Sequence, residues 1–144
     1  ERTFRRLDPR LEVYSLACPL FVPLVEEGRC RPGDRVIETV AAEYLLPLRE
    51  RGVDTLVLGC THYPLLTDVI GQIMGPGVQL VDVGAEAAAA CRELLSQRDG
   101  LACRPQGGAS YYTSDRASDF QRLASLFLGE DVAGQVQEID ISKY

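Results

Sequence analysis

The sequence predicts an α/β protein with a mostly parallel sheet, and three observations support this fold class. Candidate strands and candidate helices alternate along the whole chain. The run 53–58 is rich in branched apolar residues and is flanked by glycines, which is typical of a parallel strand buried on both faces. A second predicted strand, 78–83, follows one helical stretch and precedes another, as in a chain that returns repeatedly to the same sheet.

The first part of the chain contains a charged helix, a strand and a loop. The chain starts at Glu1 within the predicted helix, and residues 11–16 alternate between apolar and polar types like a half-buried strand. Residues 18–33 contain five glycines or prolines, so they are predicted to form a long loop with one short helical turn.

The next helix has recognisable ends. Asp34 suits an N-cap, and apolar residues then recur at helical spacing. Pro47 should kink this helix near its end, and Gly52 should close it. The remaining predicted elements are a strand (53–58), a tight turn (59–62), a helix (64–74), a strand (78–83), a helix (85–95), a surface loop (98–109), a strand (110–113), a helix (119–128) and a strand (136–141).

Composition excludes several classes of protein. The net charge of −6 argues against a nucleic-acid surface, which would normally be a basic patch. No apolar run is long enough to cross a bilayer, and the amino terminus lacks a signal-peptide pattern. The chain begins at Glu1, inside the charged helix, and we therefore expect it to be a fragment of a longer protein.

The chain contains five scattered cysteines, none at the spacing of a zinc ribbon or a redox pair. Free thiols in an acidic globular protein predict a cytoplasmic location. Most of these residues are expected to be small buried hydrophobes or incidental, namely Cys18, Cys30, Cys91 and Cys103.

Cys60 differs from the others because it lies where a predicted buried strand meets a predicted helix. Ligands of open α/β sheets bind at the carboxyl ends of strands. The amino end of a helix suits a substrate carboxylate and favours a thiolate over a thiol. His62 is the single histidine, and an imidazole is a common acid/base group of enzymes. Together they predict a site for proton transfer.

The same residues permit other interpretations. A lone cysteine after a strand is often a packing residue, and a lone histidine is often a helix cap or a surface residue. A Cys-x-His pair supplies two zinc ligands where a structural zinc site needs four, so no metal is predicted. The thiol is also a candidate nucleophile, oriented by a base from elsewhere.

Several stretches resemble the glutamate racemases of the aspartate/glutamate racemase superfamily. The most specific is Leu-Gly-Cys-Thr-His-Tyr-Pro-Leu-Leu at 58–66, which is similar to the family's second-cysteine motif. Residues 17–28 resemble the loop before it, and 81–86 resemble its Val-Asp-Ser-Gly-Ala-Glu segment with Val83 in place of serine. Residues 111–114 and 120–129 resemble the family's last strand and helix.

The resemblance implies a parallel-sheet sandwich and a fragment, the carboxyl-terminal half, of a pseudo-symmetric two-domain protein. Residues 1–84 would form most of the second α/β domain, and residues 85–144 would be a return segment that completes the first domain. The missing amino-terminal half would be the main partner of this chain. A homodimer is left open, and neither nucleic acid nor a membrane is expected as a partner.

The implied activity is interconversion of L- and D-glutamate without a cofactor, by one cysteine on each side of the substrate. By resemblance, Cys60 is the acid/base of this half, His62 assists it, and Thr61 and His62 bind the substrate. Glu26 is the catalytic acidic residue of the preceding loop, although its neighbour Glu27 is a second candidate. The product would be D-glutamate for peptidoglycan, and hence for the cell wall and cell shape.

Two alternatives remain. One is a related racemase or decarboxylase that acts on another carboxylate. The other is a non-catalytic interaction domain with a vestigial site. Since the second base would lie outside these residues, the fragment alone is expected to be inactive.

Overall fold

The computed structural model describes residues 1–102, 108–132 and 134–143. The expectation for Cys103 lies outside this part of the chain. Contacts divide the chain into two compact units, Glu1–Ala89 and Ala90–Tyr144. The units are described separately below, and the domain assignment of 1–84 and 85–144 stays a prediction.

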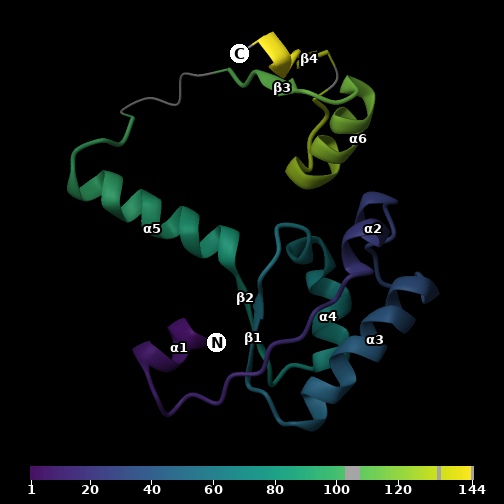
Figure 1. The fold of residues 1–144 in the computed structure, drawn as a ribbon, viewed down its shortest axis with the longest axis vertical. Coiled ribbons are helices and arrows are strands. Elements are labelled where there is room, and N and C mark those ends of the chain that lie inside the picture. Colours follow the sequence, from purple (N-terminus) through teal and green to yellow (C-terminus); the bar gives the residue numbers. More distant parts are fainter. Residues whose placement is uncertain (103–107, 133, 144) are drawn as a thin grey trace. The chain divides into compact units, whose positions relative to one another are not determined.

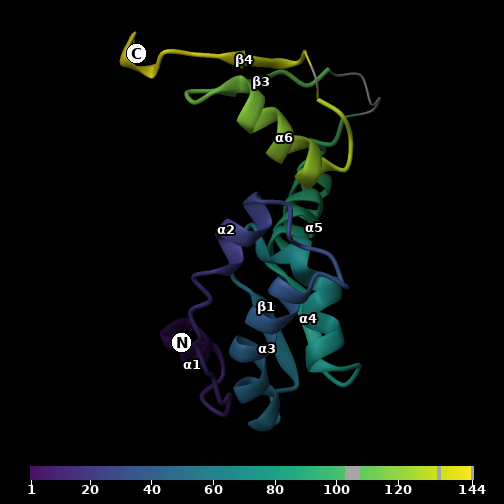
Figure 2. The ribbon, with the colours of Figure 1, turned by 90° about the vertical axis from the view of Figure 1, so that its right-hand side faces the viewer.

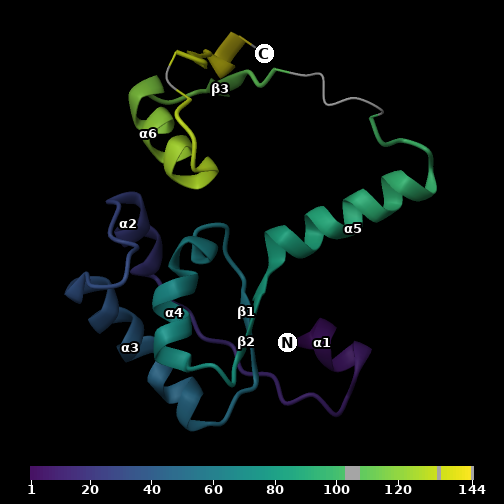
Figure 3. The same cartoon turned by 180° about the vertical axis from the view of Figure 1, so that it is seen from behind.

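The first unit is a two-stranded parallel sheet with helices beside it. Strands β1 (Thr55–Leu58) and β2 (Gln79–Asp82) pair in parallel, with Thr55 opposite Gln79 and Leu58 opposite Asp82. Helices α3 and α4 pack against each other on one side of the sheet, and α1 lies on the other side (Figures 1 and 3). The other elements are α1 (Arg2–Leu7), α2 (Phe21–Glu26), α3 (Arg35–Glu50), a 3₁₀ helix (Tyr63–Leu66), α4 (Thr67–Met74) and α5 (Val83–Gln97), which runs into the second unit.

The core of the first unit lies between the helices and the sheet. In α3 the buried residues are Ile37, Ala41 and Leu45, spaced four apart so that they form one apolar stripe. The other large buried side chains of this unit come from α2, β1, the 3₁₀ helix and α4, and they are Phe21, Val25, Leu58, Leu66, Val69, Ile70 and Met74.

The predicted ends of α3 are confirmed. The Asp34 carboxylate accepts a hydrogen bond from the Val36 amide at 2.9 Å, as an N-cap does. Gly52 has a φ of +70°, the left-handed conformation that ends helices at glycine. Pro47 lies in the last turn, and the helix continues past it to Glu50.

Two expectations for this unit are wrong. Residues 11–16 form no strand, because within the described chain residues 12–16 make no backbone–backbone hydrogen bond that could build a ladder. Tyr14 is held by side chains instead, with the Arg51 guanidinium 4.8 Å from its ring centroid. Strand β1 is not buried on both faces, since Val57 is 40% exposed in a sheet that has two strands among the described residues.

The second unit repeats the pattern on a smaller scale. Strands β3 (Tyr111–Thr113) and β4 (Val136–Glu138) pair in parallel, and α6 (Ala117–Leu128) packs against β4 (Figure 2). The predicted last strand is shorter than expected, because Ile141–Lys143 forms a 3₁₀ turn. The predicted loop 98–109 lies partly outside the described residues.

The fold class is therefore confirmed as α/β, with both strand pairs parallel. Among the described residues, no helix combines the length and the apolar character that crossing a membrane requires.

Candidate active site

The predicted site residues lie on the turn that follows β1. The strand ends at Leu58, Gly59 to His62 form the turn, and the 3₁₀ helix begins at Tyr63. The expected helix starts here as a single 3₁₀ turn, and the α-helix itself begins only at Thr67. Pro64 lies in the first turn of the 3₁₀ helix, where its missing amide hydrogen costs no hydrogen bond.

The turn brings Cys60, Thr61 and His62 together around one ring nitrogen. The Cys60 sulfur lies 4.0 Å from Nδ1 of His62, and the Thr61 hydroxyl oxygen lies 3.2 Å from the same atom. Thr61 is exposed, whereas Cys60 and His62 are half-buried. The thiol and the imidazole are therefore neighbours at the outer limit of a sulfur hydrogen bond, and a direct proton transfer between them would need a closer approach.

Glu26 reaches the other side of the same ring. Its Oε1 lies 3.3 Å from Nε2 of His62, although the two residues are far apart in sequence. A neutral ring that donates its Nε2 proton to Glu26 leaves Nδ1 as an acceptor for the Thr61 hydroxyl or the Cys60 thiol. Glu27 is exposed at the C-cap of α2, and the structure shows no ion pair or hydrogen bond for its carboxylate.

An aromatic cluster of Phe21, Tyr44 and Tyr63 packs next to the turn. The buried Phe21 ring forms edge-to-face pairs with Tyr63, at 5.4 Å between centroids, and with Tyr44, at 5.3 Å. The Tyr63 hydroxyl donates a hydrogen bond to the Cys18 carbonyl at 3.4 Å. Burial raises the pKa of the Cys18 thiol and is also the main cause of the raised pKa of Tyr63, so both groups stay protonated at neutral pH.

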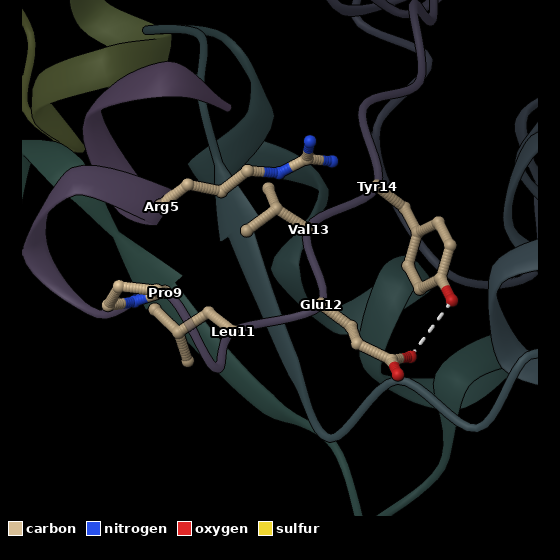
Figure 4. Close-up of a pocket in the computed structure, with 6 residues that line it drawn as sticks. All are labelled: Arg5, Pro9, Leu11, Glu12, Val13 and Tyr14. Carbon is tan, nitrogen blue, oxygen red and sulfur yellow. Dashed lines mark hydrogen bonds between the residues drawn. The ribbon is translucent and has the colours of Figure 1, made fainter.

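The first unit has a larger hollow that reaches this turn and a smaller one that does not. A cavity of about 720 Å³ between residues 10–18 and β1 is bordered by Gly59 and Tyr63, but its lining does not include Cys60, His62 or Glu26. A smaller hollow is lined by Arg5, Pro9, Leu11, Glu12, Val13 and Tyr14, where the Tyr14 hydroxyl donates to Glu12 at 3.1 Å (Figure 4). Cys60, His62 and Glu26 thus line neither of these two hollows.

Metal ligation has no geometric basis in the part of the chain that the structure describes. No group of three or more histidine, cysteine, aspartate or glutamate side chains is close enough to hold an ion there. Cys60, His62 and Glu26 form a line of contacts through the imidazole, which suits relay of a proton.

Comparison with known proteins shows a clear similarity to one group of enzymes. A curated glutamate racemase from Geobacter metallireducens is 46% identical over 143 residues, which are 97% of this chain and 51% of that protein. The chain is a homologue of the glutamate racemases. It spans about half the length of the curated glutamate racemases that it matches.

Solved structures of glutamate racemases agree with this assignment. An isoform from Bacillus anthracis matches with a TM-score of 0.84 and 31% identity over 97% of this chain and 51% of that one. The enzyme from Francisella tularensis, solved in complex with D-glutamate, matches with a TM-score of 0.83 and 28% identity over 99% of this chain and 53% of that one. No protein-family model matches the chain.

Proposed function

We propose that the complete protein interconverts L- and D-glutamate, and that this chain supplies one of two acid/base groups. The observation that carries the proposal is the contact of Cys60 and Glu26 with opposite nitrogens of His62, in a chain that is 46% identical to a glutamate racemase. The D-glutamate complex of the homologue from Francisella tularensis supports glutamate as the substrate class.

The chemistry requires a group on each face of the α-carbon. A single base would return the proton to the face it came from and regenerate the same enantiomer. In the proposed reaction, the Cys60 thiolate takes the α-proton of one enantiomer while an acid on the other face protonates the carbon. The roles reverse for the other enantiomer, with Cys60 as the thiol. The second group would be a cysteine outside these residues, and no cofactor takes part.

The neighbours of Cys60 have separate proposed roles. Nδ1 of His62 exchanges the proton of the thiol, from a distance of 4.0 Å between the heavy atoms. Glu26 holds the imidazole through Nε2, which keeps Nδ1 directed at the turn. The exposed Thr61 hydroxyl, together with His62, binds polar groups of the substrate.

The test is racemisation of L- and D-glutamate by the complete protein, followed by circular dichroism of the amino acid. Replacing Cys60 with serine should lower kcat by about 10²- to 10⁴-fold, the usual worth of a positioned acid or base. In heavy water, the wild type should incorporate deuterium at the α-carbon of the inverted product, and the variant should not.

The matched control is Cys91→Ser, because Cys91 is exposed on α5 and belongs to no predicted site. It should keep the wild-type rate. Equal activity of Cys60→Ser and wild type would contradict the proposal. Aspartate and hydantoins, supplied as competing substrates, would reveal a related racemase or decarboxylase, and inactivity towards all of them would favour a non-catalytic domain.

Further proposals concern the setting of the reaction. The product, D-glutamate, would supply peptidoglycan synthesis in the cytoplasm and so support the cell wall and cell shape. The other half of the same protein would be the partner that completes the site. This chain alone would therefore be inactive, and D-glutamate formation by these 144 residues alone would contradict that.

A further inference from the structure

Tyr63 is bonded to both of the segments that carry the proposed site. Its amide donates a hydrogen bond to the Cys60 carbonyl at 3.2 Å. Its hydroxyl donates to the Cys18 carbonyl at 3.4 Å, across 45 positions of sequence. One side chain thus connects the turn of Cys60 with the segment that precedes α2.

The Cys18 carbonyl is also where α2 is anchored. It accepts a second hydrogen bond, from the amide of Phe21 at 3.1 Å, and Phe21 is the first residue of α2. Glu26 is the last residue of the same helix, and it contacts His62. The Tyr63 hydroxyl therefore connects the start of α2 to the turn that contains His62. The end of the same helix contacts His62 through Glu26.

The geometry of the aromatic rings makes this link rigid. The Tyr63 and Phe21 rings meet at 89°, the edge-to-face arrangement that aromatic pairs prefer. Phe21 is buried and meets Tyr44 in the same way, at 79°. A change of the χ1 angle of Tyr63 would displace both the ring and the hydroxyl, and it would break the ring contact and the hydrogen bond together.

We propose that Tyr63 is a positioning residue, whose hydroxyl, through the Cys18 carbonyl and α2, sets the distance between Glu26 and His62. The expected effect of Tyr63 on kcat rests on the proposed function. Its expected effect on the contact between Glu26 and His62 rests on geometry alone. The tyrosine after the Cys-Thr-His turn thus has a role beyond its ring contact with Phe21.

The kinetic test is a double-mutant cycle in the complete protein, with Tyr63→Phe, Glu26→Gln and both changes together. Phenylalanine keeps the ring contact with Phe21 and removes only the hydroxyl. Tyr63→Phe should lower kcat for glutamate by about 2- to 10-fold, the net worth of one hydrogen bond, and leave KM within about twofold. In the Glu26→Gln background the same change should cost less than about twofold, because coupled residues are not additive.

The structural test does not depend on activity. The ¹⁵N resonance of Nε2 of His62 reports the hydrogen bond of that atom, and its assignment follows from its loss in His62→Gln. In Tyr63→Phe this resonance should move at least halfway towards its position in Glu26→Gln. The matched control is Tyr44→Phe, which removes another 3.4 Å hydroxyl contact of the same cluster, with the Leu20 amide, without reaching the turn of Cys60. It should leave the resonance and kcat unchanged.

The outcomes separate the two proposals. A moved resonance in a protein without racemase activity would support the positioning role and overturn the proposed function. An unmoved resonance in Tyr63→Phe, fully additive losses in the cycle, or an equal effect of Tyr44→Phe would each overturn the positioning role.

Discussion

Phe21 is predicted to be the side chain on which the stability of the candidate site most depends. It is 1% exposed and lies at the first position of α2, the helix that carries Glu26. Its ring has edge-to-face neighbours on two other elements, Tyr44 of α3 and Tyr63 of the 3₁₀ helix. Truncation of Phe21 therefore removes contacts that join three elements.

The magnitude follows from the contacts that are lost. Replacing a buried phenylalanine with alanine costs about 3–5 kcal/mol, which combines lost burial with the cavity left behind. Each edge-to-face pair contributes about 0.5–1.5 kcal/mol beyond burial, so the two pairs together account for about 1–3 kcal/mol. Phe21→Leu keeps most of the apolar volume and loses the two pairs, and it should therefore cost about 1–3 kcal/mol.

The assay is equilibrium unfolding of the complete protein in urea, followed by far-ultraviolet circular dichroism. The control is Leu20→Ala, because the neighbouring Leu20 is 50% exposed, and surface changes of this kind usually stay within about 0.5 kcal/mol. A loss below about 1.5 kcal/mol for Phe21→Ala, or equal losses for the alanine and leucine variants, would refute the reasoning.

Two further predictions concern pH and backbone conformation. Burial raises the pKa of Cys18 above its ordinary value of 9.0, so the unfolded chain releases this proton first. The contribution of the thiol to the free energy of unfolding is then complete below pH 9, and it falls as the pH rises from there towards the folded-state pKa. Urea titrations across this pH range should show the decline in wild type and not in Cys18→Ala. Gly52→Ala should lower the free energy of unfolding by about 1–2 kcal/mol, because φ is +70° at Gly52, whereas Gly77→Ala, in open space without a positive φ, should leave the thermal midpoint unchanged.

The structural features predicted best from the sequence are those that depend on residues close together in the chain. The N-cap at Asp34 and the closing glycine at Gly52 depend on contacts within a few positions, and both are found where they were expected. The alternation of helices and strands predicted the α/β class, since burial periodicity is also a local property. The contact of Cys60 with His62 belongs to the same group, because a single residue separates them.

Contacts between segments far apart in the sequence could not be predicted from the spacing of residues along the chain. Only the family resemblance directed attention to Glu26, whose contact with His62 needs α2 folded back onto the turn after β1. The hydrogen bond from Tyr63 to Cys18 was missed for the same reason, and Cys18 was predicted only as a small buried hydrophobe or an incidental residue. A tyrosine directly after the turn, opposite a loop rich in prolines, was the signal that a hydroxyl was available to a carbonyl of that loop.

The two wrong predictions share one physical cause, which is that strand patterns describe a sheet and not a single segment. Residues 11–16 alternate correctly, and Val57 has the apolar character of a strand buried on both faces. Either pattern is satisfied only when a neighbouring strand or layer is present, because backbone groups need ladder partners and apolar faces need cover. The described part of the first unit provides a single strand pair, so Val57 stays exposed and residues 12–16 stay unpaired. In a wider sheet, a further strand could pair with residues 12–16 and a further layer could cover Val57. The homologues are about twice as long as this chain and so have additional residues for such a sheet.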